Sequence, residues 1–541
     1  MKHAALFFLP LIALAPSVVY AEEKVDLSIV HRIRMEAFES SRVMDHAFWL
    51  TDVYGPRLTN SPGFNKAAEW AVKRLTEYGL TNAKLEAWGP YGRTWSFSRF
   101  SAHLLEPQYT PLIGAPLAWS NPTNGPLTGE PILARIETED DMAKHSGKLR
   151  GQIVLIDALR PLMMITTAPG RRFTEAELAA AAAAPEPGTP QQEYPGQRPL
   201  LGRFRNREEL TKWRNKVRDY LIDEGVLLAV MNARGEGGTV FAQSASTREA
   251  KDRVAVPTVA LTPEHYNRIA RLLEKKIPVR VEFEIQSAVI DAPADSFNVI
   301  AEIPGTRKRD EVVMLGAHLD SWHSGTGATD NAAGVAVVME AARILKTLNL
   351  PMDRTVRVAL WGGEEQGLLG SKGYVKQHFA DPEVMQPLPE HGRISGYFNI
   401  DNGTGKIRGV YLQSNDMMRP IFEAWLAPFR DLGVTTVSIR NTGSTDHASF
   451  DRVGIPGFQF IQDQIEYSTR THHSNMDVYD RLQRGDLMQA SAVLASVLYH
   501  AAMRPEMLPR KPLPKPEPKK TPEAKPEAPV SSGGGTAASA R

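Results

Sequence analysis

The strongest constraint on the fold is an alternation of short apolar runs with loops and a helix, which begins at Ser296. Compact runs rich in β-branched residues recur from there on: NVIAEIP, EVVMLGAH, TVRVALWG, ISGYFNID and GFQFIQD. Between the second and third runs lies GVAVVMEAARILKTL, which has the apolar spacing of an amphipathic helix. Strands that alternate with helices favour an α/β layer. The sequence therefore predicts a largely parallel or mixed β-sheet flanked by helices.

The length and the changes in composition divide the chain into several parts. A chain of 541 residues exceeds one ordinary hydrophobic core, so we expect at least two domains with appendages. Short β-rich pieces, GQIVLID and GVLLAVMNA, indicate a β-rich insert that interrupts the α/β domain. We expect the first part of the α/β domain over 22–120, the insert over 121–290, and the second part over 291–505.

Two further segments have biased compositions. The stretch near 165–205 is rich in Ala and Pro, and we expect a long mobile excursion there, in which the Ala run alone forms a short helix. Residues 506–541 are dominated by Pro, Lys, Glu, Gly and Ser, which favours a disordered tail.

Charge and cysteine content exclude several classes of function. The net charge is +1, which leaves no electrostatic footprint for nucleic acid. The chain has no cysteine, so thiol catalysis and Cys-based zinc sites are excluded. Residues 1–21 have the pattern of a cleaved signal peptide, and no later stretch could cross a bilayer, so we expect no membrane span in the mature protein. An exported chain without disulfides is expected in a bacterial periplasm or secreted into the medium.

Acidic and imidazole side chains follow the predicted strands, where functional groups of open α/β sheets collect. These residues are His318, Asp320, Asp330, Glu364, Glu365, Asp401, His472, His473 and Asp477. Each alone has an ordinary structural explanation, such as a helix N-cap for Asp330 or a turn former for Asp401. Together they would repel one another unless a cation neutralised them. Histidines and carboxylates without thiolates suit zinc or a similar divalent metal.

Five motifs in order carry a specific resemblance. GAHLDSW, GATDNAAG, WGGEEQGLLGS, FNIDNGTG and THHSNMD together resemble the co-catalytic zinc peptidases of the M28 family, and within it the carboxypeptidase Q branch. GKLRGQIVLID and VPTVALTPEH resemble the protease-associated domain of several family members. The likeness covers residues 25 to 503, weakly in the insert. It implies a zinc-peptidase fold with an inserted protease-associated domain and two zinc ions per chain.

The resemblance also implies a role for each site residue. His318 and Asp401 would hold one zinc, Glu365 and His473 the other, and Asp330 would bridge both. By position alone, either His472 or His473 could be the ligand. The family places a carboxylate four residues after its ligand, as Asp477 stands after His473, which favours His473.

Two carboxylates of the set would not bind metal. Glu364 would be the general base and acid acting on a metal-bridging water, and Asp320 would orient His318. The family commonly has a cis peptide after the bridging Asp, so we expect Asp330–Asn331 to be cis. Asn331 itself departs from the second Asp that many members carry at this position.

The resulting hypothesis is an exported di-zinc exopeptidase that hydrolyses dipeptides or short peptides at a terminus. One alternative is a single-zinc acyltransferase like the glutaminyl cyclases, and another is a catalytically silent binding module of the same fold. The insert is expected to act either as a lid or as support for a homodimer. For four residues the sequence does not decide between lining the pocket and a structural role: Trp322, His323, Asp446 and His447.

Overall fold

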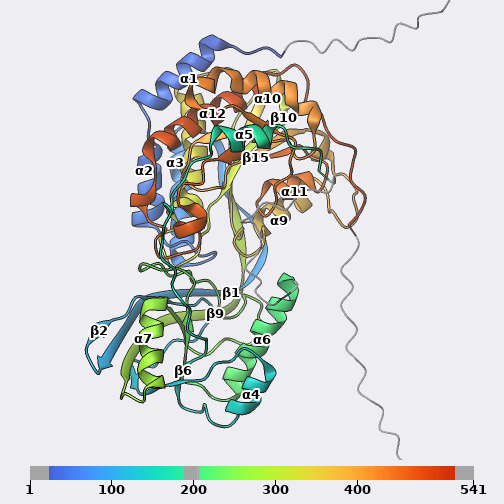
Figure 1. Cartoon of the computed structure of the whole chain (residues 1–541). Helices are drawn as coiled ribbons and strands as arrows, with labels where there is room; N and C mark the ends of the chain where they lie inside the picture. The colour runs from blue at the N-terminus through green and yellow to red at the C-terminus, as the bar shows by residue number, and fades with distance from the viewer. Residues whose placement is uncertain (1–22, 188–203, 205, 518–541) are drawn as a thin grey trace, which may run out of the picture.

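The computed structural model describes residues 23–187, 204 and 206–517. The chain forms two lobes, each organised by one β-sheet (Figure 1). The signal peptide predicted at 1–21 lies outside the described residues. Within the described ranges, no helix is both long enough and apolar enough to cross a membrane.

The larger sheet has ten strands in the order β14-β13-β15-β12-β10-β11-β9-β1-β2, with β4 paired to β9. Its centre is parallel and consists of β15 (Gly457–Gln462), β12 (Ile394–Asn399), β10 (Lys308–His318) and β11 (Arg354–Trp361). On either side the pairing becomes antiparallel, between β11 and β9 and between β15 and β13. The predicted mixed sheet is therefore confirmed. The outer strands are β1 (Thr81–Glu106), β2 (Thr110–Pro111), β4 (Leu127–Gly129), β9 (Arg280–Ile303), β13 (Ile407–Tyr411) and β14 (Thr436–Ser438).

Helices cover both faces of this sheet because successive residues of its strands point in opposite directions. Val313 and Leu315 of β10 belong to one apolar core, whereas Val312 and Met314 belong to another. The first core is shared with α1 (Leu27–Glu39), α2 (Val43–Phe48), α3 (Pro62–Glu77), α8 (Ala333–Thr347), α10 (Arg419–Leu426) and α12 (Arg484–Met503). The second core is shared with α9 (Leu369–His378) and α11 (His447–Asp451).

The smaller sheet organises the second lobe and has the strand order β3-β8-β7-β6-β5. We call residues 112–279, which include this sheet, the small-sheet domain. Its strands are β3 (Gly114–Pro116), β5 (Pro131–Leu133), β6 (Ile153–Leu155), β7 (Leu228–Asn232) and β8 (Thr258–Leu261). Three helices pack in the same lobe as this sheet: α4 (Glu139–His145), α6 (Arg207–Asp223) and α7 (Pro263–Glu274).

The two lobes are joined by the long antiparallel pair β1 and β9, which runs from one lobe into the other (Figure 1). The insert predicted for 121–290 contains most of the smaller sheet, but β3 precedes its first residue and β9 continues past its last. A border between domains that lies inside a continuous strand has no turn signal, which is why the sequence does not mark it.

The described parts of both segments with biased compositions pack on the large-sheet lobe, and the expected short helix is present in the first. The Ala run of the excursion near 165–205 forms α5 (Glu175–Ala182), which lies on the large-sheet lobe with Leu178 buried. The adjoining Arg172 pairs with Asp463 at 2.9 Å. Residues 188–203 lie outside the described part.

The start of the predicted tail also belongs to the folded lobe. Leu508 is buried there, and the Lys511 ammonium lies 2.6 Å from the Asp451 carboxylate. A buried apolar side chain and an ion pair thus hold the start of this segment against the large-sheet lobe. The disordered tail was expected to begin at residue 506, but residues 506–517 belong to the described structure. Residues 518–541 lie outside the described part.

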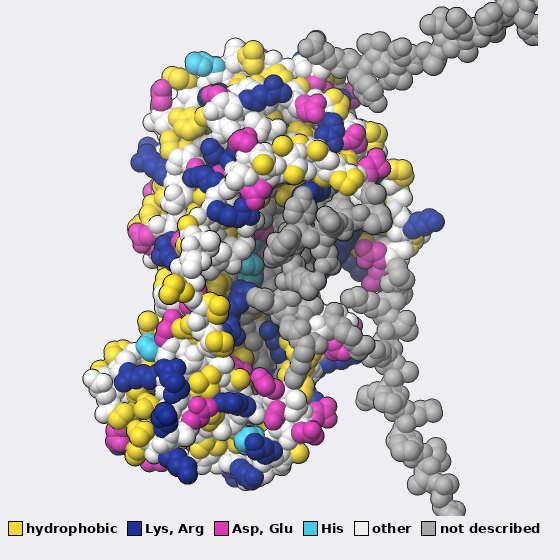
Figure 2. Space-filling view, viewed as in Figure 1, with side chains coloured by type: hydrophobic (Ala, Val, Ile, Leu, Met, Phe, Trp, Pro, Cys, Tyr) yellow, Lys and Arg dark blue, Asp and Glu magenta, His cyan; other side chains and the backbone are white. Residues whose placement is uncertain are grey.

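The described surface in Figure 2 carries basic and acidic side chains interspersed over both lobes. This mixed pattern is consistent with the near-zero net charge of the whole chain.

Candidate metal centre

The predicted site residues come together because they follow the parallel strands at one edge of the larger sheet. His318 is the last residue of β10, and Asp401 follows β12. Glu365 lies on the loop after β11, and His473 lies on the loop after β15. Asp330 lies on the loop that leads from β10 into α8. Five residues that span more than 150 positions of sequence thus meet at one place.

The two carboxylate oxygens of Asp330 face two different sets of donor atoms. Its Oδ1 lies 3.2 Å from Nε2 of His318, which is also 3.2 Å from Oδ1 of Asp401. Its Oδ2 lies 3.0 Å from Nε2 of His473, which is 2.9 Å from Oε2 of Glu365. We call His318 with Asp401 the strand set, and Glu365 with His473 the loop set. Asp330 belongs to both.

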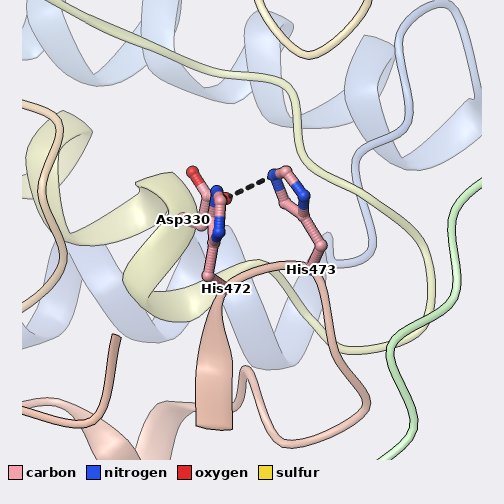
Figure 3. A group of neighbouring side chains, drawn as sticks. All are labelled: Asp330, His472 and His473. Atoms are coloured by element: carbon pink, nitrogen blue, oxygen red, sulfur yellow. Dashed lines mark ion pairs between the residues drawn. The ribbon is translucent and has the colours of Figure 1, made fainter. Parts of the chain in front are cut away.

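His472 and His473 both approach Asp330, and the geometry distinguishes them (Figure 3). Nε2 of His472 is 3.6 Å from Asp330 Oδ2, compared with 3.0 Å for His473. The His472 side chain is 39% exposed and that of His473 only 19%. The contact of His473 with Glu365 supplies a second donor group, so the structure favours His473 as the ligand.

The charges of the site suit a bound cation. Burial raises the pKa of Glu365 to about 7, and the neighbouring charge of Asp330 adds to that shift. Burial would lower the pKa of His473, but Glu365 and Asp330 outweigh it and raise this pKa to about 10. One oxygen each of Asp330 and Glu365 is buried without a hydrogen-bond partner. Imidazole nitrogens and carboxylate oxygens about 3 Å apart fit a small divalent ion held at roughly 2.0–2.2 Å.

Asp320 holds the site together in a way the sequence did not show. Its main-chain oxygen lies 3.0 Å from Nδ1 of His318, whereas its carboxylate is 3.7 Å from that nitrogen. The carboxylate instead accepts hydrogen bonds from the main-chain N–H groups of Glu364 (3.1 Å) and Glu365 (3.2 Å). Asp320 therefore orients the histidine mainly through its backbone and fixes both glutamates through its side chain.

Asp477 fixes the position of Asp330 rather than that of His473. Its carboxylate accepts hydrogen bonds from the N–H groups of Thr329 (2.6 Å) and Asp330 (3.2 Å). The peptide bond between Asp330 and Asn331 is cis, as expected. Asn331 donates to the main-chain oxygen of Ile400 at 3.0 Å, so this residue has a structural contact of its own.

Glu364 is buried close enough to the strand set for the charges of His318 and Asp401 to act on its carboxyl group. Burial raises its pKa well above the usual range of a glutamate; the positive charge of His318 opposes this shift, and Asp401 and Asp446 increase it. Asp446 is buried, and burial raises its own pKa to about 7. His447, by contrast, bonds to the main-chain oxygen of Thr442 at 3.0 Å. Of this pair, His447 supports the loop, and Asp446 is the buried carboxylate whose charge acts on Glu364.

Trp322 and His323, on the loop after Asp320, pack against neighbouring groups. Trp322 is buried between the rings of Trp119 and His473, each 6.1 Å away. His323 contacts the main-chain oxygen of Pro116 through Nε2 at 2.8 Å and lies 4.8 Å from the Trp95 ring. Trp322 thus forms the wall behind His473, and His323 lies where the two lobes meet.

Arg57 is a site residue to which the sequence assigned no role. It is fully buried and donates to the main-chain oxygens of Leu50, Leu319, Thr326 and Gly327 at 2.7–2.9 Å. These bonds hold the loop from His318 to Asp330 in place. The motif GPRLTNSPG contains Arg57, but three of its four partners lie more than 260 positions further along the chain, so only the fold shows what it does.

Comparison with known proteins identifies a peptidase region in the larger lobe. Residues 298–498 match the model of peptidase family M28. The crystal structure of a peptidase M28 precursor from Shewanella amazonensis is 26% identical, covers 90% of this chain and 98% of its own, and superimposes with a TM-score of 0.64. The chain thus carries a peptidase family M28 region. It is a metallopeptidase, and the matched region contains all five residues of the two donor sets.

Two other relatives extend the comparison beyond the matched region. Carboxypeptidase Q of Pongo abelii is 26% identical over 469 residues, which are 85% of each chain. BSAP, a zinc aminopeptidase from Bacillus subtilis, is 19% identical, covers 86% of this chain and 95% of its own, and has a TM-score of 0.53, which shows a common fold. Because these relatives cover 85% and 86% of this chain, the similarity includes the small-sheet domain as well as the larger lobe.

Proposed function

We propose that this M28 peptidase is a di-zinc exopeptidase that hydrolyses dipeptides or short peptides at a terminus. The observation that carries the proposal is the arrangement of Asp330, whose two oxygens face His318 and His473 on opposite sides. A carboxylate shared between two His–carboxylate sets fits two ions better than one. Zinc is the metal named for the B. subtilis aminopeptidase, and the N/O donor set here suits it.

The residues divide the chemical work between them. When bound, paired zinc ions supply Lewis acidity that lowers the pKa of water and polarises the substrate carbonyl. Glu364 accepts the proton of the attacking water and returns it to the leaving amine, and no covalent enzyme intermediate is needed. The Asp320 carboxylate keeps Glu364 and Glu365 in fixed orientations, so that one moves protons while the other holds metal.

The names of the relatives support an exopeptidase and leave the terminus open. They include a carboxypeptidase and an aminopeptidase. Export to the periplasm or the medium, the protease-associated character of the small-sheet domain and a homodimer remain part of the proposal. Detection of a mature chain that begins at Glu22 in the periplasmic or culture fraction would test the export.

The test of function combines metal content with a substrate panel. The panel contains a free dipeptide, an N-blocked dipeptide, a C-amidated dipeptide and an N-terminal glutaminyl peptide. Wild type, Glu364→Gln and the control Glu69→Gln, an exposed helix position, are compared. We expect about two zinc per chain in all three, with peptide hydrolysis reduced at least ~10²–10⁴-fold in Glu364→Gln alone.

The panel also assigns the terminus and distinguishes the alternative functions. Loss of hydrolysis on N-blocking alone indicates an aminopeptidase, loss on C-amidation alone a carboxypeptidase, and loss on both a dipeptidase. One zinc with cyclisation of the glutaminyl peptide indicates an acyltransferase. Absence of both metal and turnover indicates a binding module and refutes the proposal.

A further inference from the structure

The small-sheet domain reaches the loop set through the segment that follows β7. The main-chain N–H of Ala242 donates to the oxygen of His473 at 3.3 Å, and the N–H of Asn475 donates to the oxygen of Val240 at 3.0 Å. Phe241 and Ser474 form an antiparallel bridge between these bonds. The segment 238–243 thus pairs with the metal-site segment 473–475 as a short piece of sheet.

Asn475 fastens the same two segments with its side chain. Its Oδ1 accepts a hydrogen bond from the N–H of Val240 at 2.8 Å, and its Nδ2 donates to the oxygen of Gly238 at 3.0 Å. The other side of the segment is anchored within the small-sheet domain, because the N–H of Ala118 donates to the main-chain oxygen of Gln243 at 2.9 Å. Gln243 therefore has a fixed backbone beside the site.

The side-chain amide of Gln243 contacts the free nitrogen of the His473 ring. Its Nε2 is placed 2.9 Å from Nδ1 of His473, on the opposite side of the ring from Asp330 and Glu365. A half-turn of the amide exchanges its nitrogen and oxygen without moving the side chain. A ligand histidine that uses Nε2 keeps its proton on Nδ1 and needs an acceptor there, which the amide oxygen supplies.

The backbone conformation of His473 also depends on contacts from its surroundings. Its φ of +64° lies in the left-handed region, which residues with a side chain rarely adopt. Such a conformation persists when the surrounding contacts impose it, and here several of these contacts come from the small-sheet domain. His318 is different, because its Nδ1 is satisfied by Asp320 of its own lobe.

We propose that the small-sheet domain completes the metal centre, with Gln243 as a positioning residue that orients His473 through Nδ1. The proposal rests on the proposed metal function and adds to it a role for the second lobe. It predicts that Gln243 affects the ion held by the loop set and leaves the ion held by the strand set unchanged.

The test measures zinc affinity in the full-length protein by competition with a chelating dye. Gln243→Leu removes the acceptor, Gln243→Glu keeps one, and Gln108→Leu serves as the control at another exposed glutamine. We expect Gln243→Leu to weaken one of the two zinc ions about 10–100-fold. Gln243→Glu and Gln108→Leu are expected to keep both affinities.

Two further readouts separate orientation from general damage. The thermal unfolding midpoint of the metal-free protein is expected to be the same for wild type and Gln243→Leu, because Gln243 is exposed. In the cobalt-loaded protein, the visible absorption of one of the two ions is expected to change in Gln243→Leu and to return in Gln243→Glu.

Unchanged zinc affinities in Gln243→Leu would refute the positioning role while the metal function stands. Equal weakening of both ions, or weakening that Gln243→Glu does not restore, would also refute it. If the wild type binds no zinc, the proposed function fails and this inference fails with it.

Discussion

The two donor sets of the metal centre are built in different ways. The strand set lies at the ends of β10 and β12, and the His318 side chain is only 1% exposed. The loop set lies on loops, with His473 in a left-handed conformation and in contact with a second lobe. The first is fixed by the sheet that also forms the core, whereas the second depends on contacts between lobes. The stability of the fold and the presence of all the metal ligands in position therefore depend on different contacts.

Removal of the shared carboxylate should have the largest effect, because it affects both sets. Asp330→Ala is expected to lose both zinc ions and to lower kcat/KM by more than ~100-fold, beyond the effect of losing an outer partner of a ligand. Metal analysis and peptide hydrolysis measure this, with the exposed Asp480→Ala as control. Retention of one tightly bound zinc would show that the two sets do not share Asp330.

Removal of Arg57 should weaken the framework beneath both sets. Arg57→Met leaves four carbonyl oxygens without their buried donor, so the free energy of unfolding is expected to fall by about 3–5 kcal/mol. Urea unfolding of the metal-free protein measures this, and the exposed Arg309→Met is the control. A change below about 1 kcal/mol would mean that water replaces the lost donor.

Acid should act on the junction of the two lobes through His323. Burial lowers the pKa of this side chain from 6.5 to about 4. The unfolded chain binds the proton more readily than the folded chain, so the free energy of unfolding falls as the pH drops from 6.5 to 4. The expected loss at this single residue is on the order of 3 kcal/mol.

His323→Gln keeps a donor for the main-chain oxygen of Pro116 but cannot titrate. Unfolding by urea at pH 7, 6, 5 and 4 is expected to show a shallower decline for this variant than for wild type. Equal declines would mean that His323 is solvated when it becomes charged, and that other buried histidines determine the acid response.

Single-ligand variants should separate the two sets by their effect on stability. His318→Ala and His473→Ala are each expected to lose one zinc. In the metal-free protein, both variants are expected to lower the free energy of unfolding, by about 1–3 kcal/mol for His318→Ala and by a smaller amount for His473→Ala, whose side chain is more exposed. Equal destabilisation would mean that the loop set is as much a part of the core as the strand set.

The sequence predicted those parts of the molecule that depend on local pattern. The apolar runs that end in His318 and Asp401 became β10 and β12, because β-branched residues in compact runs form buried strands. The cis bond after Asp330 was implied by the family motif. The nearness of His318 and Asp401 could be predicted because parallel strands bring their carboxyl ends to one edge of a sheet, whereas their grouping on one zinc was implied by the family motifs.

The remaining features depend on contacts between residues far apart in sequence. Gln243 lies 230 positions from His473, and neither residue has a pattern that indicates the other. The partners of Arg57 are main-chain oxygens, which have no residue identity to recognise. Asp320 was predicted as the partner of His318, but only the fold shows that its carboxylate turns to the two glutamates instead.

The most direct test of a shared bridging carboxylate is anomalous diffraction at the zinc absorption edge from crystals of the wild-type protein. We expect two zinc peaks, one between Asp330 and the strand set and one between Asp330 and the loop set. A single peak, or two peaks of which one lies away from Asp330, would contradict the account of a dinuclear centre built from both sets.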